Sequence, residues 1–237
     1  MNSFHQEIFR LLLENSSRYS DEKKADFVEH YCGTPRKLLE IKTAVRRKLI
    51  KNWCKKHVDI SDEQFLDLLD SLYSGELYDE RILTADLLSF FSDYRKVLPV
   101  ELLGKWILRL EGWAEIDNTC QSGFTASEVL ARWNEWQPFL TKLSESKSVS
   151  QRRASLVLLV KPIRESDDLR LQRQAFITIE KLMIEKDILI TKAISWLLRQ
   201  LITHHISEVA AFLDLHSEKI PKIALRETRR KLETGKK

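Results

Sequence analysis

The 237-residue chain contains little glycine and proline, with 6 and 5 residues respectively. Folds built from many β-strands need frequent turns, and turns draw heavily on these two residues. Their scarcity therefore favours helices. The hydrophobic fraction of 43% and the charged fraction of 31% are those of a globular protein, and they argue against a disordered chain.

The sequence also lacks the segments that direct a chain to a membrane or out of the cell. No apolar run approaches the ~20 residues needed to span a bilayer. The first residues, MNSFHQE, have neither a basic segment nor a following apolar one, as a secretory signal would. Cys32, Cys54 and Cys120 are far apart and form no CxxC pair, which is typical of reduced thiols. We therefore expect a cytoplasmic protein without membrane contact, associated with the nucleoid in a bacterium.

Motifs for metal and nucleotide chemistry are missing as well. The 6 histidines are scattered, and neither HExxH nor a paired CxxC occurs, so we expect no metal site. No glycine-rich loop of a phosphate-binding type is present, which disfavours a nucleotide cofactor. The sequence contains no motif for a strained nucleophile turn, so nothing in it indicates a Ser-His-Asp site. An enzyme with this sequence is expected to work without a cofactor.

Basic residues are concentrated in two parts of the chain, although the net charge is only +4. Residues 36–57 and 219–237 are rich in lysine and arginine, whereas residues 61–80 are acidic. Charge segregated in this way suits a polyanion bound on one face of the protein. Two solvated helix faces would produce the same pattern, so that alternative stays open.

Apolar residues recur at helical spacing along almost the whole chain. One stripe lies within residues 4–12, and another within residues 65–72 follows a capping box made by Ser61 and Gln64. The same periodicity predicts further helices over residues 80–94, 100–110, 126–143, 150–163, 169–185, 191–204 and 223–232.

Short breaks containing glycine, proline or polar residues separate these helices, which predicts a stack of helical hairpins. The hairpins recur at about the ~40-residue period of HEAT and armadillo repeats. We therefore predict an all-α fold of the HEAT/armadillo-like helical-repeat class, curved into a solenoid with a basic concave groove. A compact helical bundle is the alternative. Residues 1–237 are expected to form a single domain, with residues 232–237 as a disordered tail.

Trp113 and Asp117 form the most informative pair of side chains. They are four residues apart, so on a helix that starts after Gly112 the indole and the carboxylate share one face. An aromatic face attracts a cation by ~0.5–2 kcal/mol, and a carboxylate stabilises positive charge in a transition state. The pair therefore fits a site where positive charge is held or develops. A core tryptophan beside an exposed aspartate is the alternative interpretation.

Three further side chains have two interpretations each. Trp196 lies beside the small residues Ala193 and Ser195, which would let another backbone approach, but it could equally be a core residue. Arg153 begins a deeply apolar helix and either faces a phosphate or is solvated. Tyr31 precedes the break at residues 33–35 and is either a packing residue or a lid over a site.

Together these stretches resemble the DNA alkylation repair family with HEAT-like repeats, the AlkD-like alkylpurine DNA glycosylases. Residues 41–47, IKTAVRR, are similar to the family segment G-I-[KQ]-T-P-x-R-R, and Trp113 with Asp117 fits its W-x-x-x-D pair. Residues 192–199, KAISWLLR, resemble K-A-[IV]-[GS]-W-x-L-R. Glu115 and Ile116 stand where the family commonly has Thr and Val. The likeness follows the family's order over nearly the whole chain.

The resemblance implies a set of site residues. Asp117 would be the catalytic acid, and Trp113 and Trp196 would complete the catalytic site, with Tyr31 as a third aromatic side chain. Arg153 would grip a phosphate. The residues expected to bind DNA are Tyr31, Lys42, Thr43, Arg46, Arg47, Arg152, Arg153, Arg199, Arg226 and Arg229.

The resemblance also implies an activity. The chain would be a hydrolase of base excision repair that cleaves the N-glycosidic bond of cationic N3- or N7-alkylated purines in duplex DNA. Asp117 would stabilise the positive charge left on the sugar. Alkylated double-stranded DNA is the expected partner, bound by a monomer. The alternatives are a non-catalytic HEAT-repeat binder of branched or distorted DNA and a helical scaffold that binds proteins.

Overall fold

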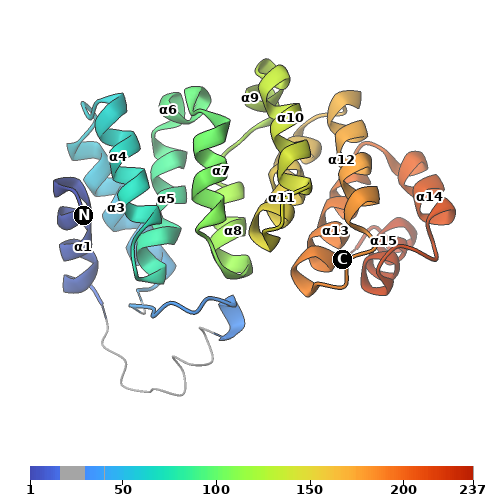
Figure 1. The fold of residues 1–237 in the computed structure, drawn as a ribbon, viewed down its shortest axis with the longest axis horizontal. Helices are drawn as coiled ribbons and strands as arrows, with labels where there is room; N and C mark the ends of the chain where they lie inside the picture. The colour runs from blue at the N-terminus through green and yellow to red at the C-terminus, as the bar shows by residue number, and fades with distance from the viewer. Residues whose placement is uncertain (17–29, 40, 237) are drawn as a thin grey trace. The chain divides into compact units, whose positions relative to one another are not determined.

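A computed structural model describes residues 1–16, 30–39 and 41–236 of the chain (Figure 1). The described residues form α-helices joined by turns, and no β-strand occurs among them. This confirms the predicted all-α helical-repeat class. The chain divides into two compact units, unit 1 (Met1–Gly123) and unit 2 (Phe124–Lys237), which we describe separately. The expectation of a single domain over residues 1–237 stays a prediction.

Unit 1 is built around a row of helices in which α5 packs against α3 on one side and α8 on the other (Figure 1). Helix α4 packs on α5, and α1 packs on both α3 and α4. The helices are α1 (Ser3–Glu14), α3 (Thr43–Lys56), α4 (Asp62–Tyr73), α5 (Tyr78–Phe90), α6 (Ser92–Val97), α7 (Val100–Leu108) and α8 (Gly112–Cys120).

Unit 2 repeats this arrangement, since α13 packs between α11 and α15, while α10 and α12 pack on α11. Its helices are α9 (Ala126–Ala131), α10 (Trp133–Ser144), α11 (Val149–Glu165), α12 (Leu169–Leu182), α13 (Ile188–Leu201), α14 (Ile206–Leu215) and α15 (Lys222–Thr234). Residues 153–160 of α11 are all buried. Within this stretch residues 156–160 are apolar on every side of the helix, as expected of an enclosed helix. Helix α15 continues through Thr234, past the start of the tail predicted for residues 232–237; Lys237 lies outside the described residues.

Two predicted helices are interrupted in the structure. The helix predicted over residues 80–94 is divided at Phe91, which has φ −89° and ψ 63° and separates α5 from α6. Periodicity predicts a single helix over residues 126–143, but Arg132 has φ −120° and ψ 37° and separates α9 from α10. Apolar side chains continue across this break, since Val129 and Trp136 are both buried. The hydrophobic pattern therefore contains no trace of the interruption.

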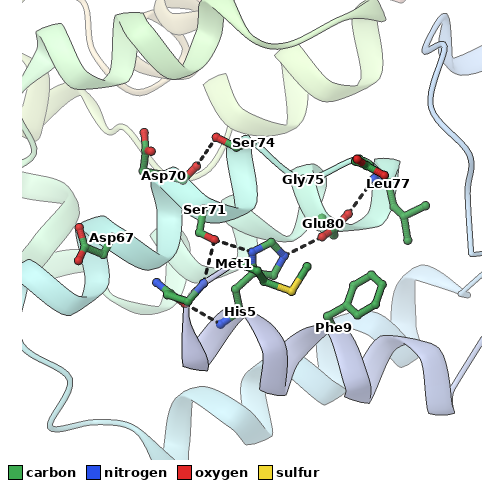
Figure 2. A pocket seen from close by; sticks show the side chains of 12 residues that line it. Met1, His5, Phe9, Asp67, Asp70, Ser71, Ser74, Gly75, Leu77 and Glu80 are labelled. Atoms are coloured by element: carbon green, nitrogen blue, oxygen red, sulfur yellow. Dashed lines mark hydrogen bonds and ion pairs between the residues drawn. The ribbon is translucent and has the colours of Figure 1, made fainter.

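A series of hydrogen bonds between buried polar side chains connects α1 to α4 and α5 beside a pocket of about 650 Å³ (Figure 2). His5 and Glu80 are each 1% exposed, and His5 Nε2 lies 2.7 Å from Glu80 Oε1. The other ring nitrogen of His5 lies 2.7 Å from Ser71 Oγ, and the second carboxylate oxygen of Glu80 accepts from the Leu77 N–H at 2.7 Å. Asn2 caps α1 by accepting from the His5 N–H at 2.8 Å. The start of α1 is thus fixed by hydrogen bonds as well as by apolar packing.

Replacing His5 with Ala should destabilise unit 1 by roughly 1.5–3 kcal/mol, because the buried Glu80 carboxylate loses a hydrogen-bond partner. Urea-induced unfolding measures this loss. Gln6→Ala is the matched control, since Gln6 is exposed on the same helix, and it should change the free energy of unfolding by no more than about 0.5 kcal/mol. Equal losses in the two variants would show that the tie contributes nothing to stability.

Candidate active site and nucleic-acid interface

A cavity of about 630 Å³ lies in unit 1 where the starts of α3 and α5 meet α8. Six of the residues predicted for the site line this one cavity: Lys42, Thr43, Arg46, Arg47, Trp113 and Asp117. They come from two segments far apart in the sequence, which the packing of α3 and α8 on opposite sides of α5 brings together. The cavity is therefore the candidate site of unit 1.

Helix α8 carries the predicted aromatic–carboxylate pair. Trp113 and Asp117 are both half-buried and both face the cavity, so Trp113 is not an enclosed core side chain. The Trp113 Nε1–H donates to the Tyr31 carbonyl oxygen at 2.6 Å. The two rings meet edge to face, with centroids 5.4 Å apart and an interplanar angle of 87°. Tyr31, which is 63% exposed, thus stands against Trp113 at the border of the cavity.

Two glycines make this approach possible. Gly33 and Gly112 have φ values of +67° and +70°, a region that side chains other than glycine rarely adopt. A Cβ added to Gly112 would lie 2.2 Å from the Gly33 carbonyl oxygen, so the two backbones are in direct contact. A Cβ added to Gly33 would meet only ordinary contacts at 3.5–3.9 Å, so at that position it is the positive φ that favours glycine. The segment that carries Tyr31 can lie this close to the start of α8 because Gly112 has no side chain.

The first turn of α3 presents accessible groups of the kind that suits an anion. Lys42 and Thr43 are exposed at the helix start, where the unpaired N–H groups and the helix dipole favour negative charge. Arg47 is also exposed, with Nε 3.5 Å from Asp86 Oδ1. Arg46 is only 5% exposed, and its Nε lies 3.4 Å from Asp86 Oδ2. Of the four predicted residues, Arg46 is therefore the one held inside the protein.

The cavity also contains polar residues that the sequence did not single out, among them Tyr78, Asp79 and Asn118. Asp79 is 3% exposed, and its Oδ2 accepts from the Leu39 N–H at 2.7 Å. Burial raises the pKa of the Asp79 carboxyl above its usual value. Burial, together with the neighbouring Cys32, also raises the pKa of Tyr78. In the sequence, Asp79 is only an acid in the first turn of a helix. Such acids are common because they stabilise the helix dipole, so this position alone does not indicate a site.

The predicted residues of unit 2 differ in how accessible they are. Trp196 is half-buried on α13. Arg153 is 4% exposed and donates from Nη1 to the Leu189 carbonyl oxygen. Arg152 pairs with both carboxylate oxygens of Glu185, at 2.7 Å from Nε and 3.1 Å from Nη2. Both guanidinium groups thus hold neighbouring parts of unit 2 together.

Helix α15 carries the exposed cations of the predicted set in unit 2. Arg226 and Arg229 are exposed, and Arg229 Nη2 lies 3.5 Å from Asp214 Oδ1. Arg199 is 7% exposed and forms an ion pair with Glu227 that joins α13 to α15. Because Trp196 belongs to unit 2 whereas Trp113 and Asp117 belong to unit 1, a site made by all three stays a prediction.

The described part of the chain contains neither a candidate metal cluster nor a helix that could cross a membrane. Within residues 1–16, 30–39 and 41–236, no three His, Cys, Asp or Glu side chains are grouped so that they could hold a metal ion. No helix in the same ranges has both the length and the apolar character needed to cross a membrane. Cys32, Cys54 and Cys120 are buried and form no disulfide.

The glycine contact gives a testable prediction. Gly112→Ala should destabilise the protein strongly, because the new Cβ would collide with backbone atoms as well as occupy a strained φ. Gly235 is the matched control: it has φ +66° but nothing within 4 Å of an added Cβ. Gly235→Ala should therefore cost only the conformational strain of about 1–2 kcal/mol. If urea unfolding gave the same loss for both variants, the backbone contact would not constrain the fold.

Comparison with known proteins identifies a family and a similar solved structure. The chain matches the family model of the DNA alkylation repair enzyme over residues 13–232. It is similar to a solved structure described as a predicted DNA alkylation repair enzyme from Enterococcus faecalis, with 18% sequence identity and a TM-score of 0.71. That alignment covers 92% of this chain and 99% of the other, and at this identity it shows the fold alone. No curated protein matches. By its match over most of its length, the chain belongs to the DNA alkylation repair enzyme family.

Proposed function

We propose that this protein is a DNA glycosylase that removes cationic N3- or N7-alkylated purines from duplex DNA. Membership of the DNA alkylation repair enzyme family supports the process. One observation carries the specific activity: the Trp113 ring and the Asp117 carboxylate line the same cavity as the exposed groups of Lys42, Thr43 and Arg47. An aromatic face and a carboxylate suit a cationic lesion, while the basic groups suit the phosphates beside it.

The reaction requires a group that stabilises positive charge on the sugar. When the C1′–N bond breaks, its electron pair leaves with the purine and neutralises the charge of the alkylated base. The sugar becomes an oxocarbenium-like cation, which the half-buried Asp117 carboxylate stabilises. Water then adds to C1′ and passes its proton to Asp117. Trp113 holds the cationic base or sugar against its face, and the neighbouring Tyr31 ring extends this aromatic surface.

The DNA backbone would be held by groups that are accessible in each unit. In unit 1 these are Lys42, Thr43 and Arg47, together with the N–H groups at the start of α3. In unit 2 they are Arg226 and Arg229, with Trp196 as a further aromatic contact. Four arginines of the predicted set already have internal partners, and each would have to exchange one for a phosphate: the buried Arg46, Arg153 and Arg199, and the half-buried Arg152.

The natural ligand would be alkylated double-stranded DNA, bound by one copy of the chain. Such an activity is expected in the cytoplasm, on the nucleoid if the chain is bacterial.

Asp117→Asn tests the catalytic assignment. It should lower the rate of base release by at least about 100-fold, because it removes the charge that stabilises the sugar cation. The affinity for alkylated duplex should change less than about threefold, since the basic groups remain. The measurement is release of 7-methylguanine or 3-methyladenine from a methylated duplex, with Asp93→Asn, an exposed carboxylate of unit 1, as the control. No release by the unaltered protein would refute the glycosylase proposal, and undiminished release by Asp117→Asn would refute the role of Asp117.

Replacing Lys42 and Arg47 together with Ala tests the phosphate contacts. Each lost contact should reduce the slope of log Kd against log salt concentration by about 0.9. Lys96→Ala with Lys105→Ala removes the same charge from positions that do not line the cavity. This control should leave the slope unchanged. If the two double variants bind DNA alike at every salt concentration, the first turn of α3 does not contact phosphates.

A further inference from the structure

Glu115 is an acidic residue completely enclosed in unit 1, and the reaction proposed above does not use it. Its side chain has no exposed surface, yet it lies on α8 between Trp113 and Asp117. The Thr34 hydroxyl donates to Glu115 Oε1 at 2.6 Å, and the Glu111 N–H donates to Oε2 at 3.0 Å. Arg36 Nη1 lies 3.1 Å from Oε1 and 3.3 Å from Oε2. One carboxylate thus binds both the 34–36 segment and the start of α8.

These contacts are the kind that a buried charge needs. An ionised carboxylate is costly to bury unless it is paired and hydrogen-bonded, and both oxygens of Glu115 are satisfied in this way. Arg36 is itself only 12% exposed, and its Nη2 also reaches the Glu111 carboxylate at 2.9 Å. Residues 34 and 36 are therefore fixed to α8 by charge-assisted bonds, which are stronger than neutral ones.

The same two segments carry the aromatic side chains of the candidate site. Tyr31 precedes Thr34 by three residues, and Trp113 precedes Glu115 by two. Gly33, whose backbone contacts Gly112, lies between Tyr31 and Thr34 in the sequence. Before Gly33, the Tyr31 carbonyl accepts the hydrogen bond from Trp113 Nε1, and after it Thr34 and Arg36 bind Glu115. If the Glu115 bonds are lost, the Tyr31 segment is held to α8 by the remaining contacts alone.

We propose that Glu115 is a positioning residue: by binding Thr34 and Arg36, it keeps the Tyr31 carbonyl and ring against Trp113 and so orients the indole beside Asp117. Glu115 does not line the cavity and would not touch DNA. The reaction depends on orientation, because a shift of about 1 Å in a reacting group can lower a rate about 100-fold. The catalytic part of this proposal rests on the function proposed above, whereas its structural part does not.

The structural part is tested on the indole N–H of Trp113 by ¹⁵N–¹H NMR, with the signal assigned by its absence in Trp113→Phe. Glu115→Ala should accelerate hydrogen exchange of this N–H at least about tenfold, because the Tyr31 carbonyl is no longer held in place. Glu111→Ala is the matched control: it removes an exposed carboxylate that also binds Arg36 but leaves the Glu115 bonds intact. The control and the conservative Glu115→Gln variant should retain slow exchange. Unchanged exchange in a folded Glu115→Ala protein would overturn the proposal.

Should Glu115→Ala fail to fold, Thr34→Val and Arg36→Met remove its bonds one at a time and are read in the same way. The expected result is faster exchange of the Trp113 N–H in at least one of them, with the other indole signals unchanged. Slow exchange in both folded variants would contradict the positioning role.

The catalytic part is tested by single-turnover base release at saturating enzyme. Glu115→Ala should lower this rate about tenfold or more, with less than about a threefold change in Kd for the duplex, because the groups of α3 are untouched. Glu115→Gln should recover most of the rate. If the unaltered protein releases no base, the glycosylase proposal fails while the NMR result still decides the structural part. If exchange of the Trp113 N–H accelerates but base release does not slow, Glu115 has no part in the reaction.

Discussion

The contact between Gly33 and Gly112 is the constraint on which the candidate site depends. It requires a left-handed backbone at both positions and leaves no space for a Cβ at Gly112. Because the two backbones meet there, the segment before α3 lies against the start of α8, and Tyr31 comes to stand beside Trp113. Helix α8 begins at this contact, and it carries both Trp113 and Asp117. The left-handed backbone at both glycines and the absent Cβ of Gly112 thus allow Tyr31 to lie against Trp113.

The basic residues fall into two classes: buried ones that bind internal partners, and exposed ones that can meet a polyanion. Arg36 and Arg46 in unit 1 pair with buried or half-buried carboxylates, and Arg153 in unit 2 binds a backbone carbonyl. A buried guanidinium needs such partners, since leaving it unpaired would cost several kcal/mol, roughly 3–5. Exposed groups such as Lys42 and Arg226 are solvated, so they do not need an internal partner and are available to a polyanion. The number of basic residues in a segment therefore overstates the number that can meet DNA.

Structure could be predicted from the sequence where the signal is local, but not where it depends on partners distant in the chain. Helical periodicity predicts most elements, and the four-residue spacing of Trp113 and Asp117 correctly predicts a shared face, because both signals are local. The break at Arg132 left no mark, since apolar residues continue on both sides of it. The environment of Arg153 was equally hidden, because its partner Leu189 lies on another helix of unit 2. Asp79 looked like an ordinary helix-start acid until packing enclosed it. Which residues distant in the sequence contact a given side chain depends on how the helices pack, and this cannot be predicted from a single sequence.

Two carboxylates line the cavity of unit 1, and their surroundings argue for different roles. Asp79 is almost completely enclosed, accepts from the Leu39 N–H and feels the positive charge of Arg46. Burial nevertheless dominates and raises the pKa of its carboxyl, so its ionised form is disfavoured relative to a free aspartate. Stabilising a sugar cation needs an ionised carboxylate that the substrate can approach. Asp117 is half-buried, lines the cavity and shares a helix face with Trp113, so a substrate can approach it. For this reason the proposed reaction runs through Asp117, while Asp79 shapes the wall of the cavity.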